Sequence, residues 1–112
     1  RIVRAMPVAN HVLAYAIDLT ASTRPKHAGG GKTAETYIEW GAGPRASQYL
    51  VLGAKAFALM EGRAAPEAAD IRRVARQVLS HRIVPNYRAT GEGLKARDIV
   101  DALVKEVKEP SY

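Results

Sequence analysis

Cysteine is absent from the 112 residues, so disulfide bonds and thiolate-bound metal sites are excluded. Aromatic residues make up only 6% of the chain. No apolar run approaches the ~20 residues that a helix needs to cross a bilayer. Acidic residues are the minority charge, with 11 of them against 17 lysines and arginines. The sequence therefore predicts neither a disulfide-stapled domain nor a membrane-spanning helix.

The remaining composition is typical of one globular domain, with 47% hydrophobic and 25% charged residues. Few aromatics together with abundant alanine favour closely packed helices over a sheet sandwich. The net charge of +6 suits nucleic acid, a nucleotide phosphate or an acidic partner surface as the binding target. Charge alone does not distinguish these targets from a basic surface that only confers solubility.

Helical periodicity and helix-boundary residues predict four helices. Prolines at helix starts and glycines after helix ends set most of the boundaries. The expected helices span about residues 7–22, 44–61, 66–80 and 98–108. The second is apolar on most sides, which predicts a buried central helix. The short β-branched segments 37–40 and 82–87 could pair as strands, so the expected fold class is all-α, a four-helix bundle with one very short β pair.

The basic segment 24–36 contains Gly29, Gly30 and Gly31 and is expected to be a loop. With Lys32 and Thr33 it imitates the end of a phosphate-binding loop, Gly-x-x-x-x-Gly-Lys-Thr. That motif requires a glycine at position 26, where this chain has lysine, and a buried strand before it. We therefore interpret the segment as a flexible basic linker and not as a nucleotide-binding loop.

Catalytic and metal-binding patterns are not recognisable in the sequence. The histidines at positions 11, 27 and 81 have no zinc-ligand spacing, and no Ser or Cys nucleophile motif is present. Pairs of acidic residues such as Glu35 and Glu39 are better explained as solvated surface. Arg72, Arg73 and Arg76 share a broad face of the third helix, which could contact a nucleic-acid backbone or an acidic domain. Both readings stay open.

Arg45 is the strongest candidate for a functional side chain. It lies in the first turn of the second expected helix, two residues after Gly43. Backbone N–H groups at such a helix end are free and the helix dipole is positive there. A guanidinium at this position can meet a phosphate carried by another domain. A plain surface arginine at a helix start is the alternative.

Residues 41–47, Gly-Ala-Gly-Pro-Arg-Ala-Ser, resemble the Gly-Ala-Ser-Pro-Arg-Ala run of MoxR-family AAA+ ATPases. In that family the run begins the second lid helix and carries the sensor-2 arginine. The likeness continues in one colinear register over residues 7–107, and its further segments are 15–25, 64–71, 78–83 and 86–91. Two departures stand out. Gly43 replaces the usual serine, which removes a possible hydroxyl cap, and the loop 26–36 is longer and more basic.

The resemblance implies that residues 1–112 form a single helical lid, a fragment of a longer ATPase, with residues 1–6 as the link from a nucleotide-binding core. It implies that ATP and Mg are held mainly by that core. Gly43, Pro44 and Arg45 would contact the nucleotide, with Arg45 as the catalytic sensor-2 residue, and the fragment alone would not hydrolyse ATP.

The implied parent is a cytoplasmic, chaperone-like motor without a membrane anchor. It assembles as a hexameric ring, so the lid's partners are its own core and the neighbouring subunits, with a von Willebrand factor A-type protein as a further partner. The alternative function is a basic helical module that binds nucleic acid or another protein, and the resemblance disfavours nucleic acid.

Overall fold

The computed structural model describes residues 7–24 and 32–107, which contain six helices and two short strands. The molecule is elongated, with principal extents of 43 × 25 × 21 Å. In chain order the elements are α2 (Asn10–Ser22), α3 (Lys32–Tyr37), β1 (Ile38–Trp40), α4 (Ala46–Met60), α5 (Ala68–Ser80), β2 (Val84–Pro85), α6 (Tyr87–Gly91) and α7 (Ala96–Glu106). The expectation of a mainly helical bundle with one short β pair is confirmed.

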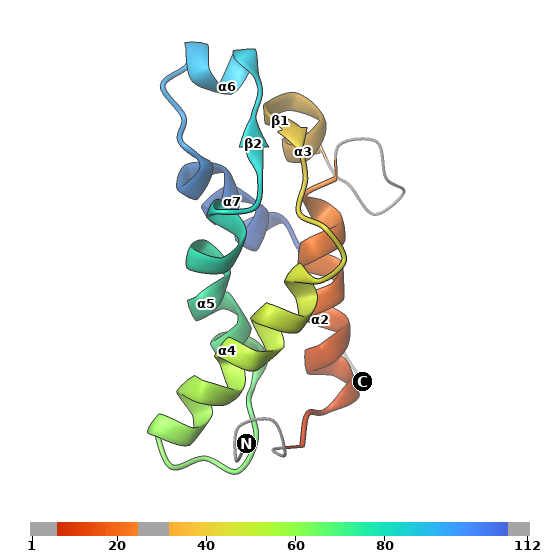
Figure 1. The fold of residues 1–112 in the computed structure, drawn as a ribbon, viewed down its shortest axis with the longest axis vertical. Coiled ribbons are helices and arrows are strands. Elements are labelled where there is room, and N and C mark those ends of the chain that lie inside the picture. The colour runs from red at the N-terminus through yellow and green to blue at the C-terminus, as the bar shows by residue number, and fades with distance from the viewer. Residues whose placement is uncertain (1–6, 25–31, 108–112) are drawn as a thin grey trace.

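The four longer helices form the bundle. α4 packs on α5 and α2, and α5 packs in turn on α7 and α2. The strands and the two short helices lie together at one end of the molecule (Figure 1). Gly53 lets α4 approach α5 closely, because a Cβ there would lie 3.1 Å from a methyl carbon of Val74. The core therefore depends on small residues at the helix contacts as well as on buried aliphatic side chains.

The helix boundaries follow the prolines and glycines only loosely. α2 begins at Asn10 and α4 at Ala46, two or three residues after the proline that was expected to open each helix. At the other end of α4, Gly62 adopts a φ of 74°, and the N–H of Arg63 donates to the carbonyl of Ala58 at 2.8 Å. Glycine ends this helix because a left-handed conformation costs it little.

The expectation of a loop over 24–36 is wrong for its last part. Residues 32–37 form α3, and Ala34 is fully buried. This helix is too short to be stable by itself and is held by contacts with α6 and α7, which the local sequence does not reveal. Residues 25–31, including the three glycines, lie outside the described residues.

α4 is less buried than its apolar sequence suggests. Its buried side chains form one stripe at four-residue spacing: Ala46, Leu50, Ala54 and Ala58. Tyr49 is 43% and Met60 80% exposed. The prediction of a buried central helix is therefore wrong, because the bundle covers one face of α4 and leaves the opposite face open.

The small sheet is formed by backbone pairing, and a side-chain hydrogen bond links the segments of the two short helices. Ile38 pairs with Pro85 and Trp40 with Val84 in an antiparallel ladder with a bulge, which confirms the expected pairing. The Tyr37 hydroxyl donates to the Glu92 carboxylate at 2.8 Å. This hydrogen bond raises the pKa of Tyr37 and lowers the pKa of Glu92, since it favours the neutral phenol and the charged carboxylate.

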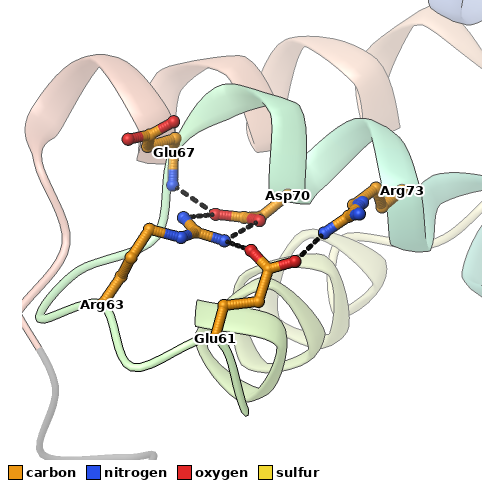
Figure 2. A network of polar contacts seen from close by, with 5 residues as sticks. All are labelled: Glu61, Arg63, Glu67, Asp70 and Arg73. Atoms are coloured by element: carbon orange, nitrogen blue, oxygen red, sulfur yellow. Dashed lines mark hydrogen bonds and ion pairs between the residues drawn. The ribbon is translucent and has the colours of Figure 1, made fainter. Parts of the chain in front are cut away.

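An ion-pair network fastens the turn between α4 and α5 (Figure 2). Both Arg63 terminal nitrogens donate to the two Asp70 carboxylate oxygens, at 2.6 and 2.7 Å. Asp70 Oδ2 also accepts from the Glu67 N–H at 2.7 Å, which caps the start of α5. Glu61 bridges Arg63 and Arg73. The arginine neighbours hold the pKa values of Asp70 and Glu61 below their usual range, with Arg63 the main cause for Asp70 and Arg73 for Glu61.

Candidate functional site

The segment between β1 and α4 carries the candidate site. Residues 41–43 have no regular secondary structure, and Pro44 and Arg45 form a turn that leads into α4. The carbonyl of Gly43 accepts from the N–H of Ala46 at 3.0 Å, so the first helical hydrogen bond starts two residues before Arg45. Arg45 is thus the residue immediately before α4, close to the position expected from the sequence.

Gly43, Pro44 and Arg45 are all exposed and adjacent at the start of α4. Within the part of the chain that the structure describes, no hydrogen bond or ion pair involves the Arg45 side chain. By contrast, Arg63, Arg73, Arg76 and Arg88 are all engaged in ion pairs. Arg45 therefore retains its five guanidinium donors for a partner outside these residues.

Arg45 lines a groove of about 450 Å³ between α2 and α4. Leu13 from α2 and Tyr49 and Leu52 from α4 contribute apolar walls, and Lys55 adds a second basic residue. The groove exists because the outer face of α4 is not covered by another helix. Sequence reasoning missed it, since the apolar residues of α4 were assigned to the core. An arginine beside apolar walls suits a ligand that combines a phosphate with a flat ring.

The segment is fixed to the end of α2 by two residues that sequence reasoning did not assign to the site. The Ala42 N–H donates to Thr23 Oγ1 at 2.8 Å, and the Ala42 carbonyl accepts from Arg24 Nε at 3.2 Å. In the sequence, Thr23 and Arg24 stand at the junction of the first expected helix and the basic loop, within a segment of the family resemblance, and neither was given a role at the site. The available signal in the sequence was a threonine and an arginine directly before Pro25 at the end of the helix.

Gly41 fits where a larger residue does not. A Cβ at this position would lie 2.4 Å from the carbonyl oxygen of Thr23, whereas a Cβ on Gly43 would have no atom within 4 Å. Neither glycine has a positive φ, so the difference is one of space alone.

Gly41→Ala is therefore expected to lower the free energy of unfolding by about 2 kcal/mol, because the clash forces the backbone apart. Gly43→Ala is the matched control and is expected to leave stability unchanged or slightly raised. Urea denaturation of the 112-residue chain, followed by circular dichroism, measures both. Equal unfolding midpoints for the two variants would contradict the close packing of Gly41 on α2.

The arginine face of α5 is occupied by intramolecular contacts. The partners are the Tyr15 ring for Arg72, the Phe57 ring and Glu61 for Arg73, and Asp101 for Arg76. These contacts neutralise or cover much of the basic face. The geometry therefore gives no specific support to the nucleic-acid alternative.

The remaining sequence candidates form no site. Lys32 and Thr33 begin α3, and the Thr33 hydroxyl donates to Glu106 at 2.6 Å, while the glycines before them lie outside the described residues. Across residues 7–24 and 32–107, no group of three or more histidines or acidic residues is placed to hold a metal ion. None of the helices in these ranges is long and apolar enough to span a bilayer.

The helical bundle with its small antiparallel pair has the architecture of the lid of AAA+ proteins. Residues 31–103 match the sequence model of the AAA lid domain, and the chain belongs to this family, in its MoxR type. Chaperone MoxR1 of Mycobacterium tuberculosis is 27% identical over 96 residues, which cover 86% of this chain and 26% of that protein. Protein MoxR of Paracoccus denitrificans is 34% identical over 103 residues, 87% of this chain and 30% of that protein.

A solved crystal structure has a similar fold. The crystal structure of a candidate ATPase from Cytophaga hutchinsonii superposes with a TM-score of 0.88 at 31% identity, over 98% of this chain and 33% of that one. The present chain thus spans about a quarter to a third of the length of these relatives.

Proposed function

We propose that this chain is the C-terminal lid of a MoxR-type AAA+ ATPase and that Arg45 is its sensor-2 arginine. One observation carries the proposal. Arg45 is exposed at the start of α4 and has no partner among the described residues, while its backbone is anchored through Ala42 to the end of α2. A fixed backbone with a free guanidinium is the arrangement expected for a residue that meets a ligand held by another domain.

The chemistry of this end of the molecule fits ATP. The planar fork of a guanidinium matches phosphate oxygens, and its charge does not depend on pH in the physiological range. The groove beside Arg45 offers apolar walls at which a purine could be covered. Since the described residues provide no cluster of metal ligands, we assign the Mg ligands to the nucleotide-binding core of the parent protein.

In this function Arg45 binds the terminal phosphate and balances the negative charge that grows there during hydrolysis. Because Arg45 is joined to α4, which packs on α5 and α2, a change in its contact with phosphate is transmitted to the whole bundle. The lid position then depends on the nucleotide state. Gly43 and Pro44 shape the approach and contribute no charged group.

We extend the proposal to the parent protein on the strength of its relatives. One of them is named a chaperone, and we propose a chaperone-like motor that works as a hexameric ring, in which this lid contacts its own core and a neighbouring subunit. A von Willebrand factor A-type protein is the proposed further partner. A cytoplasmic location is compatible with the absence of cysteine.

ATP turnover by the full-length protein tests the function directly. Arg45→Ala is expected to reduce turnover, and Arg97→Ala is the matched control, because Arg97 is also exposed near the start of a helix, α7. The isolated 112-residue chain is expected to show no turnover. Unchanged hydrolysis in Arg45→Ala would remove the sensor role.

A further inference from the structure

Two side chains at the end of α2 bind both backbone polar groups of Ala42. Thr23 Oγ1 accepts from the Ala42 N–H, and Arg24 Nε donates to the Ala42 carbonyl, at 2.8 and 3.2 Å. Ala42 is itself buried, at 2% exposure. The two hydrogen bonds hold the peptide units on either side of the Ala42 Cα, which restricts rotation about both backbone bonds of this residue. We call Thr23, Arg24 and the backbone of Ala42 the α2 clamp.

The Thr23 hydroxyl makes two hydrogen bonds, one as donor and one as acceptor. It donates to the Thr20 carbonyl at 2.7 Å, so a lone pair of Oγ1 is left to accept from Ala42. The Thr23 side chain is completely buried, which strengthens both hydrogen bonds and excludes water as a substitute partner. Gly41 adds a steric element, since its Cα lies so close to the Thr23 carbonyl that no Cβ fits.

The clamp acts only three residues before Arg45. Between them lie Gly43, where an added Cβ would have no described heavy atom within 4 Å, and Pro44, whose ring fixes φ. Beyond them, the N–H of Ala46 donates to the Gly43 carbonyl and begins the helical ladder of α4. The position of the Arg45 backbone is therefore set on one side by the clamp and on the other by α4.

We propose that Thr23 and Arg24 are positioning residues for Arg45. Their hydrogen bonds to the backbone of Ala42 keep the Arg45 guanidinium in the place where it meets the phosphate. The inference rests on the proposed function of Arg45. Its physical basis is that displacement of a charged group by about 1 Å can cost about 100-fold in rate, while the same displacement changes the packing of the bundle little. Neither residue has to touch the nucleotide.

The variants separate positioning from stability. Thr23→Val keeps the shape and removes the hydroxyl, and Thr23→Ser restores a hydroxyl. Arg24→Lys keeps the charge and removes the Nε donor, at a half-buried site where folding is less affected. Ser22→Ala is the matched control, because Ser22 is a buried hydroxyl at the same helix end that bonds to the Leu19 carbonyl at 2.6 Å and is not part of the clamp.

The experiment measures kcat, the KM for ATP and the melting temperature of the full-length protein. Thr23→Val and Arg24→Lys are each expected to lower kcat about tenfold with a smaller change in KM. The reason is that a misplaced Arg45 guanidinium loses more of its interaction with the transition state than with bound ATP. Thr23→Ser is expected to recover most of the loss. Ser22→Ala is expected to lower the melting temperature without lowering kcat.

A double-variant cycle identifies the route of the effect. In an Arg45→Ala background, Thr23→Val is expected to cause no further loss of kcat, because the residue that it positions is gone. Equal loss in both backgrounds, or normal kcat in Thr23→Val and Arg24→Lys beside a loss in Arg45→Ala, would overturn this inference and leave the function of Arg45 standing. Full turnover in Arg45→Ala would overturn the proposed function and the positioning role with it.

Discussion

Turnover of the full-length ATPase is expected to fall about 100-fold when Arg45 is replaced by alanine, which is the usual cost of removing one preorganised donor to a developing charge. The structure supports a large effect because Arg45 has no second role among the described residues that would confuse the result. Its side chain is exposed, so alanine leaves no cavity and breaks no ion pair there. The melting temperature is therefore expected to change little.

Arg45→Lys refines the same prediction. Lysine keeps the charge but presents a single ammonium in place of the planar fork, so it is expected to recover only part of the turnover. Steady-state ATP hydrolysis, with Arg97→Ala measured in parallel, gives the comparison. A full recovery with lysine would show that charge alone suffices, and a comparable loss in Arg97→Ala would show that the effect is not specific to the start of α4.

Asp70→Asn is expected to lower the free energy of unfolding by about 2–3 kcal/mol. The substitution keeps the size of the side chain but removes the negative charge of the carboxylate to which both Arg63 terminal nitrogens donate (Figure 2). The Asp70 side chain is only 2% exposed, so water cannot replace the lost partner there. Asp101→Asn is the matched control, because its ion pair with Arg76 is about half exposed and is expected to contribute little.

The contribution of Asp70 to the free energy of unfolding is expected to decrease as the pH falls. The pKa of Asp70 is lower in the folded chain than its usual value, chiefly because of the hydrogen bonds from Arg63. A lowered folded-state pKa gives stability that is present above the unfolded-state value and is lost as the pH falls through the folded-state value.

The difference between the original chain and Asp70→Asn should therefore be constant at neutral pH and shrink below about pH 4. Urea unfolding between pH 2 and 8, followed by circular dichroism, measures it. A difference that stays constant down to pH 2 would contradict the assigned charge effect, and an equally large loss in Asp101→Asn would contradict the importance of burial.

Much of the bundle was predictable because its signals are local. The apolar spacing of α5 and the left-handed glycine at position 62 each depend on a few neighbouring residues. The position of Arg45 before α4 was predictable for the same reason, since Pro44 marks a helix start wherever the helix later packs. α3 could not be predicted in this way, because contacts with distant helices stabilise it.

The exposed face of α4 was not predictable from local sequence signals. Its sequence is apolar on most sides, and only the arrangement of α2 and α5 decides which side is covered. The groove beside Arg45 is the uncovered side, so no periodicity within α4 could reveal it. The α2 clamp was hidden for a similar reason, since it joins residues 18 and 19 positions apart in the chain.

The sequence by itself determined the family, the helical class and the presence of an arginine at the start of α4, because these depend on residue order and on hydrogen bonding within a few residues. The tertiary structure alone decided that this arginine stays without a partner among the described residues and that its backbone is held by Thr23 and Arg24. Partnership and anchoring are properties of distances between remote segments, and these distances are set by how the helices pack and not by the pattern within any one of them.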